Sequence, residues 1–221
     1  MVKNDSRNLP EEYQTGFAKF YGRTFFVNRD VLIPRIESER LIDIVKHYCH
    51  PELARPGRAG VSGSRPKIAD IGTGSGCIGI TLKLENPGCD VTLIDISEKA
   101  LTVAKINAER LKVVVRIIKH DLLDNGDYDL VVANLPYIPH ARISKLDPGV
   151  RNYEPHLALD GGVRGLELIF RLLYQNLSKF IILEIDDTHT LKDFVKYKKF
   201  YDIKLEKDLF QRNRYLILER K

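Results

Sequence analysis

From Lys67 onward, short apolar runs alternate with segments in which apolar residues recur every three or four positions. The short runs predict strands and the amphipathic segments predict helices. Strands are expected at Lys67–Ile71, Asp90–Ile94, Val113–Ile118, Tyr128–Ala133, Phe180–Glu184, Tyr201–Glu206 and Arg214–Glu219. Helices are expected at Cys77–Leu84, Glu98–Leu111, Val163–Leu177 and His189–Tyr197. This alternation is typical of an α/β, Rossmann-like parallel sheet that is covered by helices on both faces.

The residues before Lys67 follow a different pattern. A short helix is expected over Pro10–Phe20, and the aromatic and β-branched stretch FYGRTFFVNRDVLIP, residues 20–34, predicts a hairpin that turns at Gly22. A second helix is expected at Glu37–Tyr48, where apolar residues return at helical spacing. Residues 51–66 collect Pro, Gly and Ser and predict a loop. We therefore divide the chain into an N-terminal lead-in, residues 1–65, and a larger domain, residues 66–221, that is expected to carry the chemistry.

The composition restricts the class of protein. Of 221 residues, 43% are hydrophobic and 29% are charged, which is typical of a soluble globular protein. No uncharged apolar run reaches the ~18 residues that a membrane span needs, and the N-terminal MVKNDSRN lacks the apolar core of a secretory signal. Three cysteines without C-x-x-C spacing favour neither disulfides nor zinc. A cytoplasmic protein without a metal is expected, and its charge of +5 permits nucleic-acid contact without requiring it.

The segment IADIGTGSGCIGI, residues 68–80, runs from a predicted strand through three glycines into a predicted helix. Glycines let the chain turn sharply and let a ligand approach the backbone, while a helix N-terminus offers free N–H groups. Asp95 ends the next strand, where a carboxylate can accept both hydroxyls of a ribose. Nicotinamide dinucleotide and S-adenosylmethionine sites share this combination. Two structural alternatives are an ordinary strand-helix turn and a capping role for Asp95, although Ser97 is the better cap.

A second motif, VVANLPYIP, follows directly from an apolar strand. Asn134 and Tyr137 therefore lie at the carboxyl edge of the predicted sheet, where open α/β sheets bind ligands. Pro136 and Pro139 stiffen the loop. The Asn oxygen and a backbone carbonyl can each accept one hydrogen of a planar NH₂ group, and an aromatic ring can stack on its plane. A dehydrogenase has no need of such a loop; the structural alternative is a rigid loop with a capping Asn.

Four separated blocks, in the right order, resemble the HemK/PrmC-type N5-glutamine methyltransferases, which modify the Gly-Gly-Gln motif of class I peptide release factors. The resemblance runs from about Phe20 to the C-terminus. Its blocks are FYGRTFFVNRDVLIPRIESERL, the DIGTGSG loop with Asp95, the N-x-P-Y motif, and VRNYEPHLALDGGVRGLELI followed by FIILEI. Only KDLFQRN separates the last two predicted strands, so that pair should be antiparallel. Seven strands that end in a reversed hairpin form the class I S-adenosylmethionine-dependent methyltransferase fold, here with an N-terminal hairpin and helix extension.

The resemblance implies a protein-glutamine methyltransferase that uses S-adenosylmethionine and takes a release factor as its partner. By this resemblance, Asp121 would face the exocyclic amine of the adenine and Leu122 its ring. Asn134 is shared between cofactor and substrate. The implied cofactor residues are Gly72, Thr73, Gly74, Ser75, Gly76, Asp95, Leu122 and Asn134, and the implied substrate and catalytic residues are Asn134, Leu135, Pro136 and Tyr137.

The sequence departs from the family pattern at two places. Leu135 stands where the family usually has proline, which costs rigidity but keeps the backbone carbonyl. Only twenty residues precede Tyr21, where the family carries a helical docking domain, so docking is expected to be reduced or supplied by a partner.

Three alternatives stay open. Asn-Leu-Pro-Tyr is also the form found in ribosomal-RNA adenine N6-methyltransferases, although LIPRIESE and EPHLALDGG have no place there. A ribosomal protein could carry the glutamine instead, and a degenerate methyltransferase could act as a binding module. Two further features say less about function. Arg35 with Glu37 and Glu39 is either a surface ion-pair cluster or a group near the substrate entrance. The basic stretch of residues 192–207 is either a solvated face or an RNA contact. The oligomeric state stays open.

Overall fold

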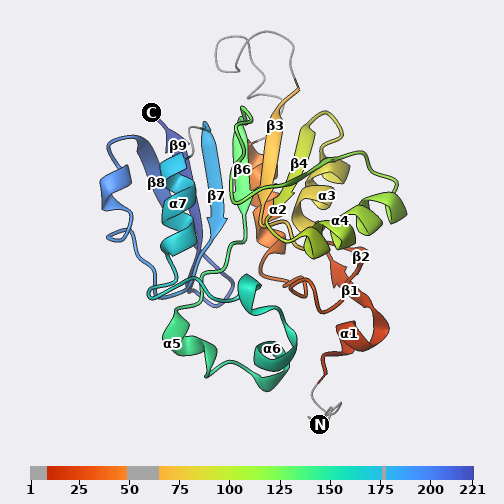
Figure 1. Cartoon of the computed structure of the whole chain (residues 1–221). Helices are drawn as coiled ribbons and strands as arrows, with labels where there is room; N and C mark the ends of the chain where they lie inside the picture. Colours follow the sequence, from red (N-terminus) through yellow and green to blue (C-terminus); the bar gives the residue numbers. More distant parts are fainter. Residues whose placement is uncertain (1–8, 49–64, 176–177) are drawn as a thin grey trace.

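The computed structural model describes residues 9–48, 65–175 and 178–221. It contains a seven-stranded sheet with the order β5-β4-β3-β6-β7-β9-β8, and a separate two-stranded hairpin (Figure 1). The large sheet comprises β3 (Lys67–Ile71), β4 (Asp90–Asp95), β5 (Arg116–Lys119), β6 (Leu130–Ala133), β7 (Phe180–Glu184), β8 (Tyr201–Lys207) and β9 (Asn213–Arg220). Strands β5, β4, β3, β6 and β7 pair in parallel, whereas β9 is antiparallel to both β7 and β8. The predicted sheet and its reversed final hairpin are confirmed.

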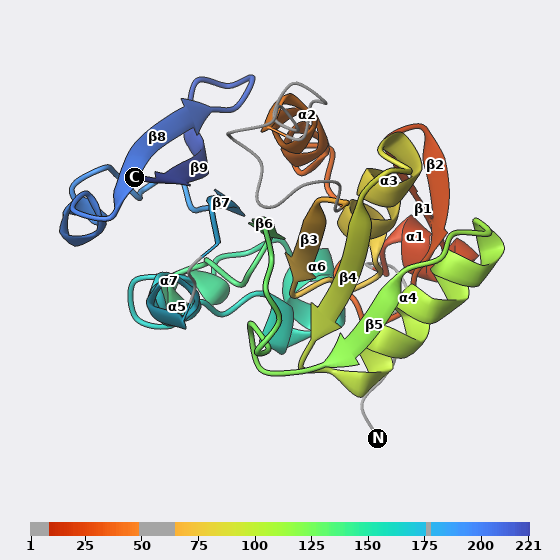
Figure 2. The same ribbon diagram turned by 90° about the horizontal axis from the view of Figure 1, so that it is seen from above.

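Helices cover both faces of the sheet because successive side chains of its strands point to opposite sides. On one face lie α2 (Glu39–Tyr48), α3 (Cys77–Glu85) and α4 (Glu98–Arg110), and on the other lies α7 (Glu167–Gln175) (Figure 2). In β3, Ile68 packs towards the first group and Ala69 towards the second. The strands in the middle of the sheet are buried along their length, as a parallel sheet between two helical layers requires.

The N-terminal hairpin, β1 (Phe17–Phe20) and β2 (Arg23–Phe26), packs beside α4. Asn107 of α4 is fully buried and ties the two together: it accepts from Phe26 N at 2.6 Å and donates to Phe26 O at 2.9 Å. The same amide group donates to Ser75 O at 2.9 Å. One side chain therefore links the hairpin to the glycine loop.

Several expected element boundaries are wrong: α2 begins at Glu39 rather than Glu37, for example, and the hairpin begins at Phe17 rather than Phe20. The first helix, α1, spans only Glu11–Thr15, because Gly16 at φ +77° ends it and Phe17 begins the hairpin. Strand β5 begins at Arg116, after Lys112 at φ +54° has ended α4. Strand β6 begins at Leu130. Helix α7 begins at Glu167, after the turn of Gly165 at φ +72°; residues 176–177 at its predicted end, and residues 49–64 of the predicted loop, lie outside the described residues.

The expected helix at His189–Tyr197 is also wrong. This segment forms turns and one short 3₁₀ helix, η4 (Val195–Tyr197). Asp193 Oδ2 accepts from both the backbone N and the hydroxyl of Thr190, at 2.8 and 3.1 Å. Such local side-chain bonds compete with the helical pattern, while Phe194 and Tyr197 still reach the core.

Three short helices that the sequence pattern did not predict follow β6: α5 (His140–Ile143), α6 (Pro148–Tyr153) and the 3₁₀ helix η3 (His156–Ala158). They lie beyond the edge at which the parallel strands end (Figure 1). No described helix is long and apolar enough to cross a membrane.

Candidate active site

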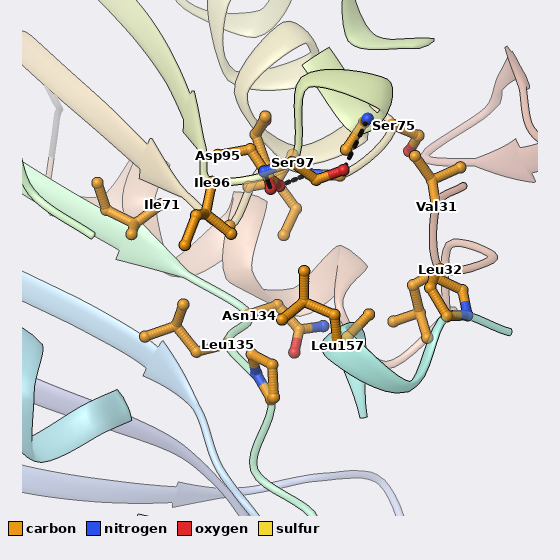
Figure 3. Close-up of a pocket in the computed structure, with 18 of the residues that line it drawn as sticks. Val31, Leu32, Ile71, Ser75, Asp95, Ile96, Ser97, Asn134, Leu135 and Leu157 are labelled. Carbon is orange, nitrogen blue, oxygen red and sulfur yellow. Dashed lines mark hydrogen bonds between the residues drawn. The ribbon is translucent and has the colours of Figure 1, made fainter. Parts of the chain in front are cut away.

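A cavity of about 280 Å³ opens at the carboxyl ends of β3, β4 and β6, at the edge where parallel sheets bind ligands. Its lining comes from four parts of the chain that are far apart in sequence. One of the four is the glycine loop with its flanks, within residues 71–78, and another lies within residues 30–38. The third lies within residues 95–100 and 120–122, and the fourth within residues 134–136 and 155–158, with Leu168 and Arg171 of α7 beside them. Figure 3 shows these groups around one hollow, with Asp95 and Ser75 opposite Asn134 and Leu157.

The glycine loop, Gly72–Gly76, turns tightly enough to bring backbone to the cavity. Its three glycines have φ of +67°, +54° and +80°, a region that side chains with a Cβ rarely adopt. A Cβ on Gly76 would lie 2.8 Å from Ile80 and 3.2 Å from Ala104, so the turn also depends on close packing against α3 and α4. Gly72, Thr73, Gly74 and Ser75 line the cavity, so the loop offers a ligand bare backbone at its first two glycines, whereas Gly76 does not line it.

Asp95 stands beside this loop with 8% of its surface exposed. Its Oδ2 accepts from Gly74 N at 2.9 Å and its Oδ1 from Ser97 N at 2.8 Å. Burial raises the pKa of this carboxyl, and the backbone N–H groups of Ser97 and Gly74 oppose the shift. Each oxygen has a second lone pair for a ligand hydroxyl. Ser97 is the cap of α4, since its Oγ accepts from Ala100 N at 3.2 Å, as expected.

Asp121 and Leu122 both line the cavity, as a pair facing a purine would. Leu122 is buried and has φ +64°. Asp121 makes an ion pair with Arg171 at 2.7 Å, and Arg171 also lines the cavity.

Asn134 is held by its amide nitrogen. Nδ2 donates to Ser38 Oγ at 2.8 Å and to Glu184 Oε2 at 3.0 Å. Within the described parts of the chain, Oδ1 has no hydrogen-bond partner, and Asn134 lines the cavity. The arrangement therefore leaves Asn134 as a hydrogen-bond acceptor for a ligand.

Leu135 and Pro136 line the cavity as well. Leu135 is buried, and its Cδ2 lies 3.1 Å from the point where a Cβ of Gly72 would be. The leucine that replaces the usual proline therefore fits because the glycine loop opposite has no side chain there.

Tyr137 does not line the cavity. Its hydroxyl donates to Glu184 Oε1 at 2.7 Å, and burial beside the Glu184 carboxylate raises its pKa well above the usual range. The backbone of Tyr137 lies against two glycines: a Cβ on Gly161 would come within 2.8 Å of Tyr137 Cα, and a Cβ on Gly165 would overlap Tyr137 O. The glycines of the EPHLALDGG block and its continuation thus admit the N-L-P-Y loop, and the stacking role of the tyrosine ring stays a prediction.

Sequence reasoning missed two residues of this site, Ser38 and Glu184. Both are buried, and Ser38 Oγ donates to Glu184 Oε2 at 2.6 Å. Both lie in blocks that carried the family resemblance, LIPRIESE and FIILEI, and the carboxylate that ends an apolar strand was the available signal.

Arg35 does not form the surface cluster that was one of its two interpretations. Its Nη2 donates to both carboxylate oxygens of Glu154, at 2.6 and 2.7 Å, and Glu154 is buried. Glu39 instead accepts from Tyr21 N. Arg35 lines the cavity, so its ion pair with Glu154 joins two of the cavity walls, residues 30–38 and the EPHLALDGG block.

Comparisons with known proteins agree with this geometry. A family model described as the methyltransferase small domain matches residues 60–146. The structure of ribosomal protein L11 methylase from Lactobacillus delbrueckii subsp. bulgaricus shares the fold, with a TM-score of 0.55 over 85% of this chain and 80% of that chain at 22% identity. The expected class I methyltransferase fold is confirmed.

Two curated relatives are more similar in sequence. The release factor glutamine methyltransferase of Koribacter versatilis is 41% identical over 170 residues, which are 75% of this chain and 57% of that protein. The protein of the same name from Flavobacterium psychrophilum is 34% identical over an alignment of 221 positions, which covers 94% of this chain and 74% of that protein. The chain spans little more than half of the first relative and three quarters of the second. The similarity to the Flavobacterium psychrophilum protein extends over nearly the whole of this chain and about three quarters of that protein. This chain therefore belongs to the release factor glutamine methyltransferase family.

Proposed function

We propose that this chain transfers a methyl group from S-adenosylmethionine to the side-chain amide nitrogen of a glutamine, in the Gly-Gly-Gln motif of a peptide chain release factor. The observation that carries the proposal is the orientation of Asn134. Its nitrogen is engaged by Ser38 and Glu184, so its oxygen is the atom left for a substrate. An acceptor at this point suits an NH₂ group.

The cavity fits the proposed cofactor. Gly72 and Gly74 present backbone without a side chain to the cavity, and the Asp95 carboxylate beside them can accept ribose hydroxyls. Ile71, Ile96 and Leu122 supply apolar walls of the kind that an adenine ring packs against. When bound, the cofactor supplies a methyl group already activated by its sulfonium. Of the cofactor residues expected from the sequence, all except Gly76 line the cavity, and these are the ones proposed here: Gly72, Thr73, Gly74, Ser75, Asp95, Leu122 and Asn134.

The chain's part in the reaction is to orient a poor nucleophile, since the lone pair of an amide nitrogen is delocalised. Asn134 Oδ1 accepts one amide hydrogen and the Leu135 carbonyl accepts the other. These two acceptors would orient the amide nitrogen towards the methyl group of a bound cofactor, so that the chain supplies alignment rather than chemical activation. Both acceptors also stabilise the positive charge that builds on the nitrogen. The proton leaves to water after transfer, so no side chain has to act as a base before it.

Residues 66–221 carry this chemistry in our proposal, and residues 1–65 form the lead-in. The lead-in contributes to the same site, because residues within 30–38 line the cavity together with the glycine loop.

The decisive experiment supplies labelled S-adenosylmethionine to the chain with three acceptors: purified release factor, ribosomal protein and ribosomal RNA. Label in a release-factor glutamine supports the proposal. Label in a ribosomal-protein glutamine keeps the chemistry and changes the partner, and label in RNA adenine overturns the assignment. Binding of S-adenosylhomocysteine without transfer to any acceptor would support a degenerate binding module.

A further inference from the structure

Glu184 is a buried carboxylate at the end of β7, with 2% of its surface exposed. Three donors from two distant segments converge on it: the Ser38 hydroxyl at 2.6 Å and, from the N-L-P-Y loop, Asn134 Nδ2 at 3.0 Å and the Tyr137 hydroxyl at 2.7 Å. Burial raises its pKa, and the hydrogen bonds from Ser38 and Tyr137 oppose the shift. The carboxylate therefore joins three parts of the chain at the wall of the cavity, although neither the sequence pattern nor the family comparison assigns it a role.

Glu184 has no ion pair among the described residues. The nearby cation is Arg214, which donates to Ile185 O at 3.2 Å and lies 3.5 Å from the Tyr137 hydroxyl. A buried carboxylate without a paired cation lowers the stability of a fold. A purely structural role would be served at less cost by a neutral side chain, which points to a role at the adjoining site.

The hydrogen-bond polarity around Asn134 shows what that role is. An ionised carboxylate only accepts hydrogen bonds. If the amide of Asn134 were flipped, its Oδ1 would lie about where Nδ2 now is, 3.0 Å from Glu184 Oε2, and two oxygens with partial negative charge would repel each other. Ser38 alone could not prevent the flip, because a hydroxyl both donates and accepts. The carboxylate therefore selects one of the two amide orientations.

We propose that Glu184 is a positioning residue, which holds Asn134 with Oδ1 towards the substrate and Nδ2 away from it, and thereby makes the site selective for an amide over a carboxylate. This inference rests on the proposed function. Ser38 assists, because its hydroxyl donates to Glu184 while it accepts from Asn134. The bond from Nδ2 to a carboxylate also polarises the amide, which strengthens Oδ1 as an acceptor.

The test compares Glu184→Ala, Glu184→Gln and Ser38→Ala with the unmodified chain, using labelled S-adenosylmethionine and a release factor as acceptor. Glu184→Ala frees the amide of Asn134 to rotate, so kcat should fall about 10- to 100-fold. Glu184→Gln keeps an oxygen for Nδ2 but adds an NH₂ group that can equally face Oδ1, so it should hold the orientation less firmly and lower kcat about three- to tenfold. Ser38→Ala removes one of the two restraints on Nδ2 and should fall between them. Calorimetry with S-adenosylhomocysteine should give the same affinity for all four proteins.

A second measurement, inhibition by a glutamate-containing release factor, would not change if the role of Glu184 were only structural. A release factor whose Gly-Gly-Gln glutamine is changed to glutamate is offered as a competitor. It should inhibit the unmodified chain weakly, since Oδ1 repels its carboxylate, and should inhibit Glu184→Ala about tenfold more strongly, because a flipped Asn134 donates to it.

The outcomes separate the inference from the function on which it rests. No methyl transfer by the unmodified chain overturns the proposed function and this inference with it. An active chain in which Glu184→Ala is equally active, or equally insensitive to the glutamate competitor, overturns the inference alone. Equal loss in the Ala and Gln variants also overturns it, because an oxygen that accepts from Nδ2 would then make no difference to turnover. Glu184→Ala could lose affinity for S-adenosylhomocysteine together with turnover, and then Glu184→Gln and Ser38→Ala decide. If these two variants also lose affinity and turnover together, the role of Glu184 is structural and the inference is overturned.

Discussion

The two sides of the cavity are built in different ways. On the proposed cofactor side, Gly72–Gly76 and Asp95 take their shape from neighbours along two adjacent strands: Gly72 N donates to Ile94 O, and Asp95 accepts from Gly74 N and Ser97 N. On the proposed substrate side, Asn134 depends on Ser38, which lies 96 residues before it, and on Glu184, 50 residues after it. Backbone contacts shape the first side, and side-chain contacts between distant segments shape the second.

A binding surface and a reactive geometry therefore place separate demands on the chain. A loop of backbone can cradle a ligand with few side chains, because glycines and a helix N-terminus supply the groups. An amide that must present its oxygen rather than its nitrogen needs partners of defined polarity. Substitutions on the two sides should therefore affect different measurements.

The largest effect is expected for Asn134→Ala. Removing the acceptor should lower kcat about 100- to 1000-fold, the range for a preorganised group that stabilises developing charge. Affinity for S-adenosylhomocysteine should change far less. Steady-state transfer to a release factor and calorimetry measure the two quantities. Asn125→Ala, at an exposed position that does not line the cavity, is the matched control. Equal losses in turnover and cofactor affinity would contradict the division between the two sides.

Asp95→Ala should have the opposite profile. Loss of the carboxylate should weaken S-adenosylhomocysteine binding by about 1–3 kcal/mol, the range for a charge-assisted hydrogen-bonding group. Calorimetry measures this directly. Asp90→Ala, at the exposed far end of the same strand, is the control and should bind as the unmodified chain does. Heat with NAD and none with S-adenosylhomocysteine would show that the cofactor side has been assigned to the wrong ligand.

Asp70→Asn tests the support beneath the glycine loop. Asp70 Oδ2 accepts from the Thr73 hydroxyl at 2.6 Å and from Gly79 N at 2.9 Å, while Oδ1 has no partner in the described structure. Burial raises the pKa of Asp70 to about 6, against those two hydrogen bonds. The native state thus binds more protons than the unfolded state between about pH 4 and 6, so this group makes stability fall as pH rises through that window.

The neutral Asn variant lacks this dependence. Its free energy of unfolding should match that of the unmodified chain near pH 4 and exceed it by about 1–3 kcal/mol at pH 7. Urea unfolding at several pH values measures the difference, with the exposed Asp90→Asn as control. A difference between the two proteins that stays constant with pH would refute the raised pKa.

The smallest effect is expected for Ser97→Ala. Its hydroxyl caps α4 by accepting from Ala100 N at 3.2 Å. Loss of such a cap typically lowers the free energy of unfolding by about 1 kcal/mol. Thermal or urea unfolding would register it, whereas Thr102→Ala on the exposed side of the same helix should be close to neutral. If both variants are equally stable, the first turn of α4 is held by packing instead.

Helices and strands were predicted correctly where the pattern of apolar residues was strong. The prediction failed where backbone conformation or side-chain hydrogen bonds set the local structure. Strands β3 and β7 were predicted with their observed bounds, because continuous apolar runs can only be buried. The expected helix at His189–Tyr197 failed: its apolar spacing is real, but the Asp193 carboxylate bonds to the backbone and hydroxyl of Thr190 and holds the segment in turns. The short helices α5 and α6 carry too few apolar residues to give a periodic signal.

The same contrast holds at the site. The α/β alternation, the glycine loop, Asp95 and the N-L-P-Y loop could all be predicted from the sequence, because each follows from residues close together in the chain. The tertiary structure decided that Asn134 presents oxygen rather than nitrogen, that Tyr137 turns its hydroxyl to Glu184, and that Arg35 reaches Glu154. These choices depend on hydrogen-bond donors and acceptors brought together by folding, and a pattern of apolar and polar positions carries no record of which distant partner a polar side chain will meet.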